Sequence, residues 1–231
     1  DRLLPNNSTE YQSPRATPEI LQADPYNRLV SRGPRFRLEG EMIRDSVLAA
    51  SGLLSRKVGG PSVFPPQPPG VWDLPYNDDR WEESKGEDRY RRALYTFVRR
   101  SAMYPAMLNF DATSREICTV RRVRTNTPLA ALTTLNDEAF LEAARALAKR
   151  ALAEGNTESA RVAAAFRFAT ARAPKPNEAD KLLTWLASER QYFEQHLEEA
   201  RKVSAGGGAN EAAWTMLANA ILNLDEVLTK E

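Results

Sequence analysis

The chain has 231 residues, 42% of them hydrophobic, and a formal net charge of +1. It is long enough for one large domain or two small ones and too apolar to be disordered. No apolar run approaches the roughly 18 residues that a membrane span needs, and the near-neutral charge argues against nucleic-acid binding. Its single cysteine, Cys118, and single histidine, His196, exclude an internal disulfide and any metal site built from several such residues.

The charges are unevenly distributed. Arginine outnumbers lysine by 25 to 7, and nine arginines lie between Arg89 and Arg124 against two acids. From Asn177 to the end, ten acids face five basic residues. Because guanidinium pairs well with carboxylates and with phosphate or sulfate, two interpretations stay open. Either the basic segment packs on the acidic helices, or it forms a surface for an external anion.

Residues 1–35 show little periodicity, and we expect an extended N-terminal arm followed by a single helical domain over 36–231. The opening DRLLPNNSTE does not have the pattern of a signal peptide, and we expect the chain to be a fragment of a larger protein.

The segment 37–55 has apolar residues at helical spacing, and we expect Gly52 to weaken its end and Gly59-Gly60-Pro61 to stop it. The next stretch, GGPSVFPPQPPGVWD, holds five prolines and predicts an extended loop anchored by Val63, Phe64 and Trp72. This loop could be packed on the surface, or it could be a lid over a ligand. Residues 73–88 predict a polar loop with Trp81 as an anchor.

Two segments, RYRRALYTFVRRS and EICTVRRV, are rich in β-branched or aromatic residues. They could form a small two-stranded β element within residues 93–123. From Asn126 onward the pattern is helical, with Pro128 in a first turn and Asp137 as a fresh N-cap. The predicted helices are 126–135, 138–155, 157–172, 177–203 and 210–228. The fold class predicted is therefore mainly α, an irregular helical domain with a long proline-rich loop.

The stretch REICTVRRVRTNTP carries the strongest hint of a binding site. Arginines leading into a helix could join its free amides in holding a carboxylate or sulfate group. The alternative is that they pair with Asp111, Glu116 or Asp137 and fix the loop. The candidate ligand-binding residues are Arg121, Arg122, Arg124, Asn126 and Thr127.

Three carboxylates, Asp111, Glu116 and Asp137, are weak candidates for the acid/base pair of a glycoside hydrolase. Nothing in their spacing requires it, and Asp137 is better explained as a helix cap.

Three other polar or reactive positions have structural explanations. Asn219 and Asn223 share one helix face and should tie the last helix to backbone elsewhere. We expect Cys118, between Ile117 and Val120, to be a core residue, and His196 to be solvated helix surface.

Several long stretches together resemble the planctomycete-specific domain of unknown function, over nearly the whole chain. They are NRLVSRGPRFRLEGEMIRD, SGLLSRKVGGPSVFPPQPPGVW, EDRYRRALYTFVRR, FDATSREICTVRRVRTNTPLAALTTLNDEAFLEAARALAKR and AWTMLANAILNLDE.

The resemblance implies a module at the C-terminal end of large exported proteins, periplasmic or at the cell surface, which often carry a cytochrome-c-type domain. It implies no established activity. Any haem would lie in another domain of the parent protein, because this chain has no CxxCH motif, so no cofactor is expected here. The partners expected are the upstream domains of the parent and an extracellular glycan or other anion. We therefore expect a non-enzymatic interaction or ligand-binding module. The alternative is a hydrolase, or a related enzyme, acting on a uronic or sulfated polysaccharide.

Overall fold

A computed structural model describes residues 17–31, 33, 36–72 and 80–230. It confirms the mainly α-helical class. None of the described helices combines the length and the apolarity that crossing a bilayer requires. The α-helices are α1 (Pro18–Ala23), α2 (Gly40–Ser51), α3 (Pro105–Leu108), α4 (Pro128–Asn136), α5 (Glu138–Leu152), α6 (Glu158–Thr170), α7 (Pro176–Gln195), α8 (Leu197–Val203), α9 (Ala209–Leu222) and α10 (Asp225–Leu228).

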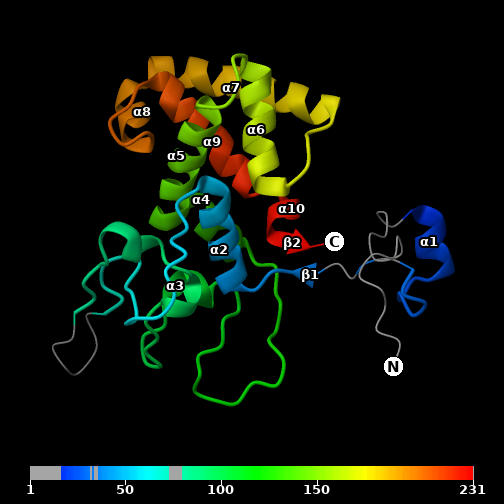
Figure 1. Ribbon diagram of the computed structural model, residues 1–231, viewed down its shortest axis with the longest axis vertical. Helices are drawn as coiled ribbons and strands as arrows, with labels where there is room; N and C mark the ends of the chain where they lie inside the picture. The colour runs from blue at the N-terminus through cyan, green and yellow to red at the C-terminus, as the bar shows by residue number, and fades with distance from the viewer. Residues whose placement is uncertain (1–16, 32, 34–35, 73–79, 231) are drawn as a thin grey trace.

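Helix α9 is the centre of the core and packs against α4, α5, α6, α7 and α8 (Figure 1). Small residues on α5 and α9 let these two helices approach closely, and many of their side chains are fully buried. Helix α2 packs on α5 and α6 and adds its own apolar face. The fully buried residues of this core include Ile43, Ala143, Leu147, Val162, Leu186, Ala212, Leu217 and Ile221.

The only sheet in the described residues joins the two ends of the domain. Strand β1 (Phe36–Arg37) pairs antiparallel with β2 (Thr229–Lys230), with Phe36 opposite Lys230. The chain therefore enters α2 beside the point where α10 ends (Figure 1). The N-terminal arm is not wholly extended, since Thr17 caps α1 by accepting from the N–H of Ile20. Residues 1–16 of that arm lie outside the described residues.

The proline-rich loop is packed on the surface of the protein, which is one of the two interpretations that the sequence left open. Val63 is buried, and Phe64 contacts both Trp81 and Phe97 at ring-centroid distances of 5.0 and 5.1 Å. Trp72 joins this aromatic cluster, with its ring 5.2 Å from that of Trp81. The predicted anchors are therefore confirmed, although residues 73–79 of the following loop lie outside the described part.

Arg91 holds the start of this loop from within the protein. Its guanidinium is almost fully buried and donates hydrogen bonds to the carbonyl oxygens of Lys57, Gly59 and Pro61. It also stacks 3.7 Å from the centre of the Tyr95 ring. A prolyl segment has few amide donors of its own, so a five-donor side chain suits its unpaired carbonyls.

The predicted starts of α4 and α5 are confirmed, whereas α2 begins at Gly40, three residues later than predicted. Thr127 caps α4 through a bond from the N–H of Ala130 at 3.2 Å, and Asp137 caps α5 through a bond from the N–H of Ala139 at 3.0 Å. Gly52, in contrast, ends α2 outright rather than weakening it. It adopts φ +82°, a left-handed conformation that glycine reaches without strain.

Two predicted long helices are each broken once. Residues 177–203 divide at His196, whose φ and ψ of −129° and 58° are not helical and whose Nδ1 lies 2.8 Å from the carbonyl oxygen of Tyr192. This break lets α8 turn back onto α9, with Ala200 buried between them. Residues 210–228 divide at Leu224, which is extended before α10 begins.

The predicted β element does not lie within residues 93–123. The first segment forms two 3-10 turns, Gly86–Tyr90 and Ala93–Tyr95, with isolated bridges from Arg91 to Ser55 and from Thr96 to Val63. The second segment is irregular, and Ile117, Val120 and Val123 are exposed. Their strand preference counts for little because no neighbouring sheet offers a face to bury them.

Candidate functional site

An irregular loop joins α3 to α4 and extends away from the helical body (Figure 1). We call residues 113–126 the arginine loop. At its base, the Asp111 carboxylate accepts hydrogen bonds from the backbone N–H and the Oγ1 of Thr125, at 2.7 and 2.8 Å. Arg37 donates to the carbonyl oxygen of the same threonine. The two ends of the loop are therefore tied together beside β1.

Arg122 attaches the loop to the start of α2. Its Nη1 and Nη2 donate to the Glu41 carboxylate at 2.7 and 3.1 Å, and Nη1 also lies 3.1 Å from Glu39. Burial raises the pKa of Glu41, but the hydrogen bonds from Arg122, a backbone hydrogen bond and the charges of Arg122 and Arg115 together hold that pKa below its ordinary value. The partners predicted from the sequence were different acids. Because Glu39 and Glu41 lie at the N-terminus of α2, they also favour that helix electrostatically.

The other loop arginines are less constrained. Arg124 lies 4.0 Å from Glu39 and 5.2 Å from the ring centre of Phe36, and 45% of its side chain is exposed. Arg115 and Arg121 are exposed and form no ion pair within the part of the chain that the structure describes. Three of the four guanidinium groups therefore remain largely hydrated and can accept an external anion.

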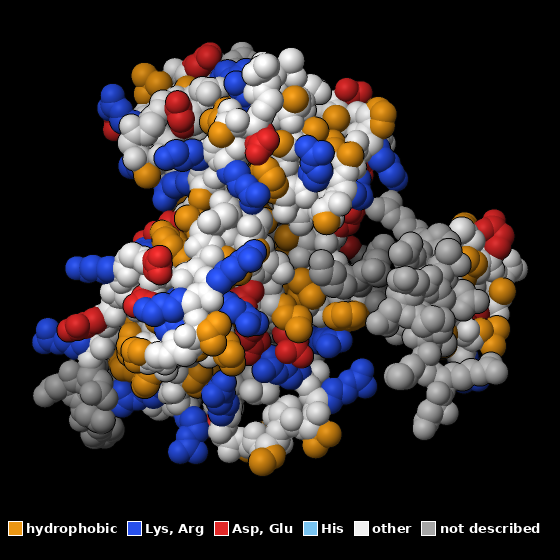
Figure 2. Space-filling model, viewed as in Figure 1, with side chains coloured by type: hydrophobic (Ala, Val, Ile, Leu, Met, Phe, Trp, Pro, Cys, Tyr) orange, Lys and Arg blue, Asp and Glu red, His pale blue; other side chains and the backbone are white. Residues whose placement is uncertain are grey.

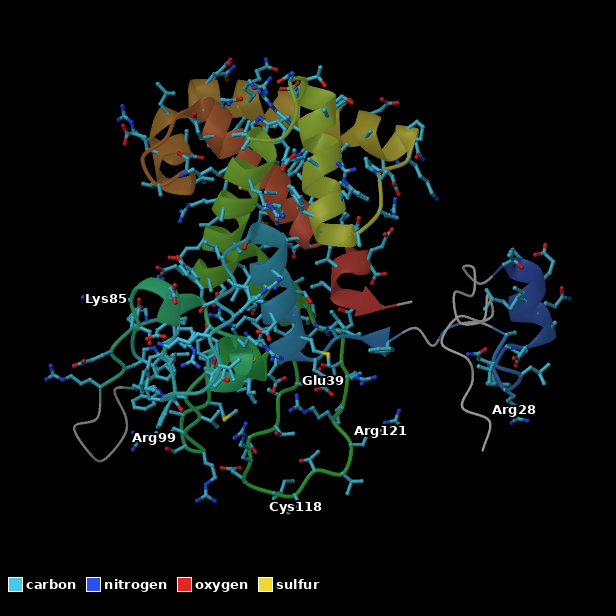
Figure 3. All side chains as sticks on the ribbon, viewed as in Figure 1. Arg28, Glu39, Lys85, Arg99, Cys118 and Arg121 are labelled. Atoms are coloured by element: carbon cyan, nitrogen blue, oxygen red, sulfur yellow. The ribbon has the colours of Figure 1, made fainter. Side chains whose placement is uncertain are left out.

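A hollow of about 670 Å³ lies between the loop and the start of α2. Figure 3 shows Glu39 at the body end of this hollow, Arg121 on one arm of the loop and Cys118 at its outer turn. Figure 2 shows basic side chains around the same opening. The lining residues are Glu39, Thr113, Arg115, Glu116, Ile117, Cys118, Thr119, Val120, Arg121, Arg122 and Arg124. Four arginines against two glutamates give it a net positive lining.

A smaller pocket of about 290 Å³ adjoins this hollow. The two share Glu39, Thr113 and Arg115. The remaining walls come from α2, from the segment after Arg91 and from α3, and most are apolar. They include Met42, Leu94, Thr96, Val98, Met103, Tyr104 and Met107.

The structure separates the predicted ligand-binding residues. Arg121, Arg122 and Arg124 line the hollow, whereas Asn126 and Thr127 are not among its lining residues. The Thr127 hydroxyl is occupied by its cap bond, and Pro128 has no N–H to offer. The amides at the start of α4 therefore contribute less than the sequence predicted.

The three candidate catalytic carboxylates do not gather at one place. Asp111 ties the base of the loop, and Asp137 caps α5, where burial raises its pKa. Only Glu116 lines the hollow. Among the described residues, no group of three or more His, Cys, Asp or Glu could hold a metal ion.

Cys118 is exposed, which corrects its predicted core position. The apolar residues beside it belong to a projecting loop, so their hydrophobicity does not indicate burial. His196 is exposed as expected, although it terminates a helix. Asn219 donates to the Leu135 carbonyl oxygen at 3.3 Å, which ties α9 to the backbone of α4 as predicted. Asn223 also contacts α4, but it accepts from the Thr134 side chain rather than from backbone.

The arginines of residues 89–124 that form ion pairs in the described structure contact mainly acids on or beside α2 and α5, rather than the acidic helices after Asn177. Arg89 contacts Glu83, Glu138 and Glu142 within 2.8 Å, and Arg92 contacts Asp45 at 3.1 Å. These contacts give the arginine-rich segment a structural role.

Sequence reasoning missed two parts of the site, the carboxylates at the start of α2 and the apolar pocket. The one available signal was the pair of glutamates on either side of Gly40, which offers a guanidinium two adjacent acceptors.

No curated protein and no solved structure gives a significant match to this chain. A family model described as PSD1, protein of unknown function (DUF1553), matches residues 3–186. That span covers most of the chain and includes the arginine loop and both cavities. The chain therefore belongs to the PSD1 family of proteins of unknown function, DUF1553.

Proposed function

We propose that this chain is a non-enzymatic ligand-binding module that holds the carboxylate or sulfate group of a glycan in the arginine-loop hollow. The observation that carries the proposal is the set of three weakly paired guanidinium groups, on Arg115, Arg121 and Arg124, around one hollow. Guanidinium groups recognise planar carboxylates and tetrahedral oxyanions through parallel hydrogen bonds. Arg122 supports the site by fixing the loop to α2.

The setting of the proposed module follows from the resemblance of the sequence to domains of large exported proteins. We infer that the parent protein is exported, periplasmic or at the cell surface, and that its glycans are extracellular. Upstream domains of the same parent would be its protein partners, and any haem would belong to one of those domains.

The test is a thermal-shift and calorimetric titration with sulfate, phosphate, glucuronate and galacturonate. We expect saturable binding by the wild type that weakens in Arg124→Ala and in Arg121→Ala. Arg167→Ala is the matched control, because it removes an exposed arginine from α6, away from the hollow. Equal binding by all four proteins, or binding by none, would contradict the proposal.

A second candidate, a hydrolase acting on anionic polysaccharide, is favoured by one observation. The hollow contains two carboxylates, Glu39 and Glu116, beside the arginines, and glycoside hydrolysis needs such a pair. The assay is release of reducing ends from uronic and sulfated polysaccharides. Activity that disappears in Glu116→Gln but persists in Glu154→Gln would favour this candidate, since Glu154 is an exposed residue after α5.

A further inference from the structure

We propose that the arginine-loop hollow and the adjoining apolar pocket form one two-part site, which selects an anionic sugar carrying a compact apolar group. This inference rests on the proposed function and specifies its ligand further. The two cavities are contiguous, because Glu39, Thr113 and Arg115 line both. A ligand held by its anionic group at Arg115 would therefore have the apolar pocket beside it.

The pocket has the character of a site for an apolar group. Three methionines, Met42, Met103 and Met107, line it together with Leu94 and Val98. Methionine is flexible and polarizable, so it adapts to the shape of an incoming group. The volume of about 290 Å³ is at the small end of ligand sites. Its mostly apolar walls suit a phenyl ring or a branched alkyl substituent better than a second sugar ring, whose hydroxyl groups would find few partners there.

One polar group in this pocket lacks a partner. Thr96 is only 7% exposed, and its Oγ1 has no hydrogen-bond partner in the described structure. A buried hydroxyl left unpaired is unfavourable. Thr96 lies among the apolar residues of a pocket whose edge also carries charged side chains, and a small shift of its neighbours would let a ligand oxygen pair with its hydroxyl.

The acids at the edge of the pocket are already neutralised. Asp45 accepts from Arg92 at 3.1 Å and from the N–H of Ala93 at 2.7 Å. Glu41 is held by Arg122. The exposed Arg115 forms no ion pair within the described residues, although its charge helps to lower the pKa of Glu41, and it favours an anion at the junction over a cation.

The experiment compares three ligands by calorimetry on the full chain: methyl β-D-glucuronide, phenyl β-D-glucuronide and phenyl β-D-glucoside. We expect the phenyl glucuronide to bind about tenfold more tightly than the methyl glucuronide, because the pocket buries the apolar surface of the phenyl ring. The phenyl glucoside, which lacks the carboxylate, should bind more weakly than the phenyl glucuronide.

Met42→Gln tests the pocket with little risk to folding. Met42 is 51% exposed on α2, and glutamine matches its length and helix propensity. This variant should reduce the preference for phenyl over methyl to less than about threefold, with methyl glucuronide affinity unchanged. Leu197→Gln, at an exposed leucine of α8, is the matched control and should keep the full preference.

The outcomes separate this inference from the proposed function. Equal affinity for the methyl and phenyl glucuronides would overturn the two-part site and leave anion binding intact. Equal affinity for phenyl glucuronide and phenyl glucoside, or no binding of either glucuronide, would contradict the proposed function itself. Tighter binding of N-acetyl-leucine than of phenyl glucuronide would overturn the sugar assignment in favour of a peptide carboxyl terminus.

Discussion

Arg122 donates two parallel hydrogen bonds to the Glu41 carboxylate, at 2.7 and 3.1 Å, although the two residues are 81 positions apart in the sequence. This contact connects the arginine loop to the first helix of the core. It also removes one arginine from the set available to a ligand. The same guanidinium lies 3.1 Å from Glu39, so a single side chain contacts two acids at the start of α2.

Replacing Arg122 by alanine should lower the free energy of unfolding by about 2 kcal/mol, because it leaves a half-buried carboxylate without its charged donor. Arg122→Lys should recover only part of the loss, since an ammonium group cannot form the parallel pair. Urea denaturation measures both values. A change within the error of the wild-type value would contradict the proposed attachment.

The contact between Arg122 and Glu41 should also make the free energy of unfolding depend on pH. The folded-state pKa of Glu41 is lower than its ordinary value of 4.5, so its contribution to stability is complete above that value and is lost as pH falls below it. The difference in stability between wild type and Arg122→Ala should therefore narrow between about pH 5 and pH 3. A difference that stayed constant over this range would exclude the linkage.

The contact between Asp111 and Thr125, which we call the clamp, should restrain the arginine loop at its base. Asp111 has φ +61° and accepts two hydrogen bonds from Thr125. Asparagine adopts that conformation at a lower free-energy cost than alanine. Asp111→Ala should therefore speed tryptic cleavage after the loop arginines more than Asp111→Asn does. Similar cleavage rates for both variants and the wild type would show that the clamp does not restrain the loop.

The ion pairs of Arg172, just after α6, should make the stability of the fold depend on pH under acidic conditions. It donates to Glu178 at 2.7 and 2.9 Å and to Glu226 at 2.6 and 2.7 Å. Hydrogen bonds from Arg172 lower the pKa of Glu178 to about 2. The stability that this group contributes is present above its ordinary pKa of 4.5 and is lost as pH falls toward 2.

Arg172→Gln should therefore return the pKa of Glu178 toward 4.5 and move acid unfolding to higher pH. NMR titration of the glutamate carboxyl carbons measures the first effect, and circular dichroism against pH measures the second. Arg201→Gln is the control, because its pair with Glu198 is a solvent-exposed contact on α8. An unchanged Glu178 titration would contradict the assignment.

The sequence predicted the features that depend on nearby residues. The helix start near Thr127 and the cap at Asp137 were recognised because a cap acts on amides two or three residues away. The Arg122–Glu41 pair could not be found in this way, since it depends on how α2 packs relative to the loop. Cys118 was misplaced for a related reason. Its apolar neighbours suggest burial, but burial requires an opposing surface that only the tertiary fold could supply.

Cys118 offers the most direct test of the hollow. It is exposed and lines the same cavity as Arg121 and Glu116. Because it is the only cysteine, a thiol reagent reports on this site alone. We expect labelling of the folded protein at a rate close to that of the urea-unfolded chain, and slower labelling when glucuronate is bound. Arg124→Ala should keep the fast labelling but lose the protection. Slow labelling of the folded wild type would mean that the loop is packed against the body and the hollow is closed.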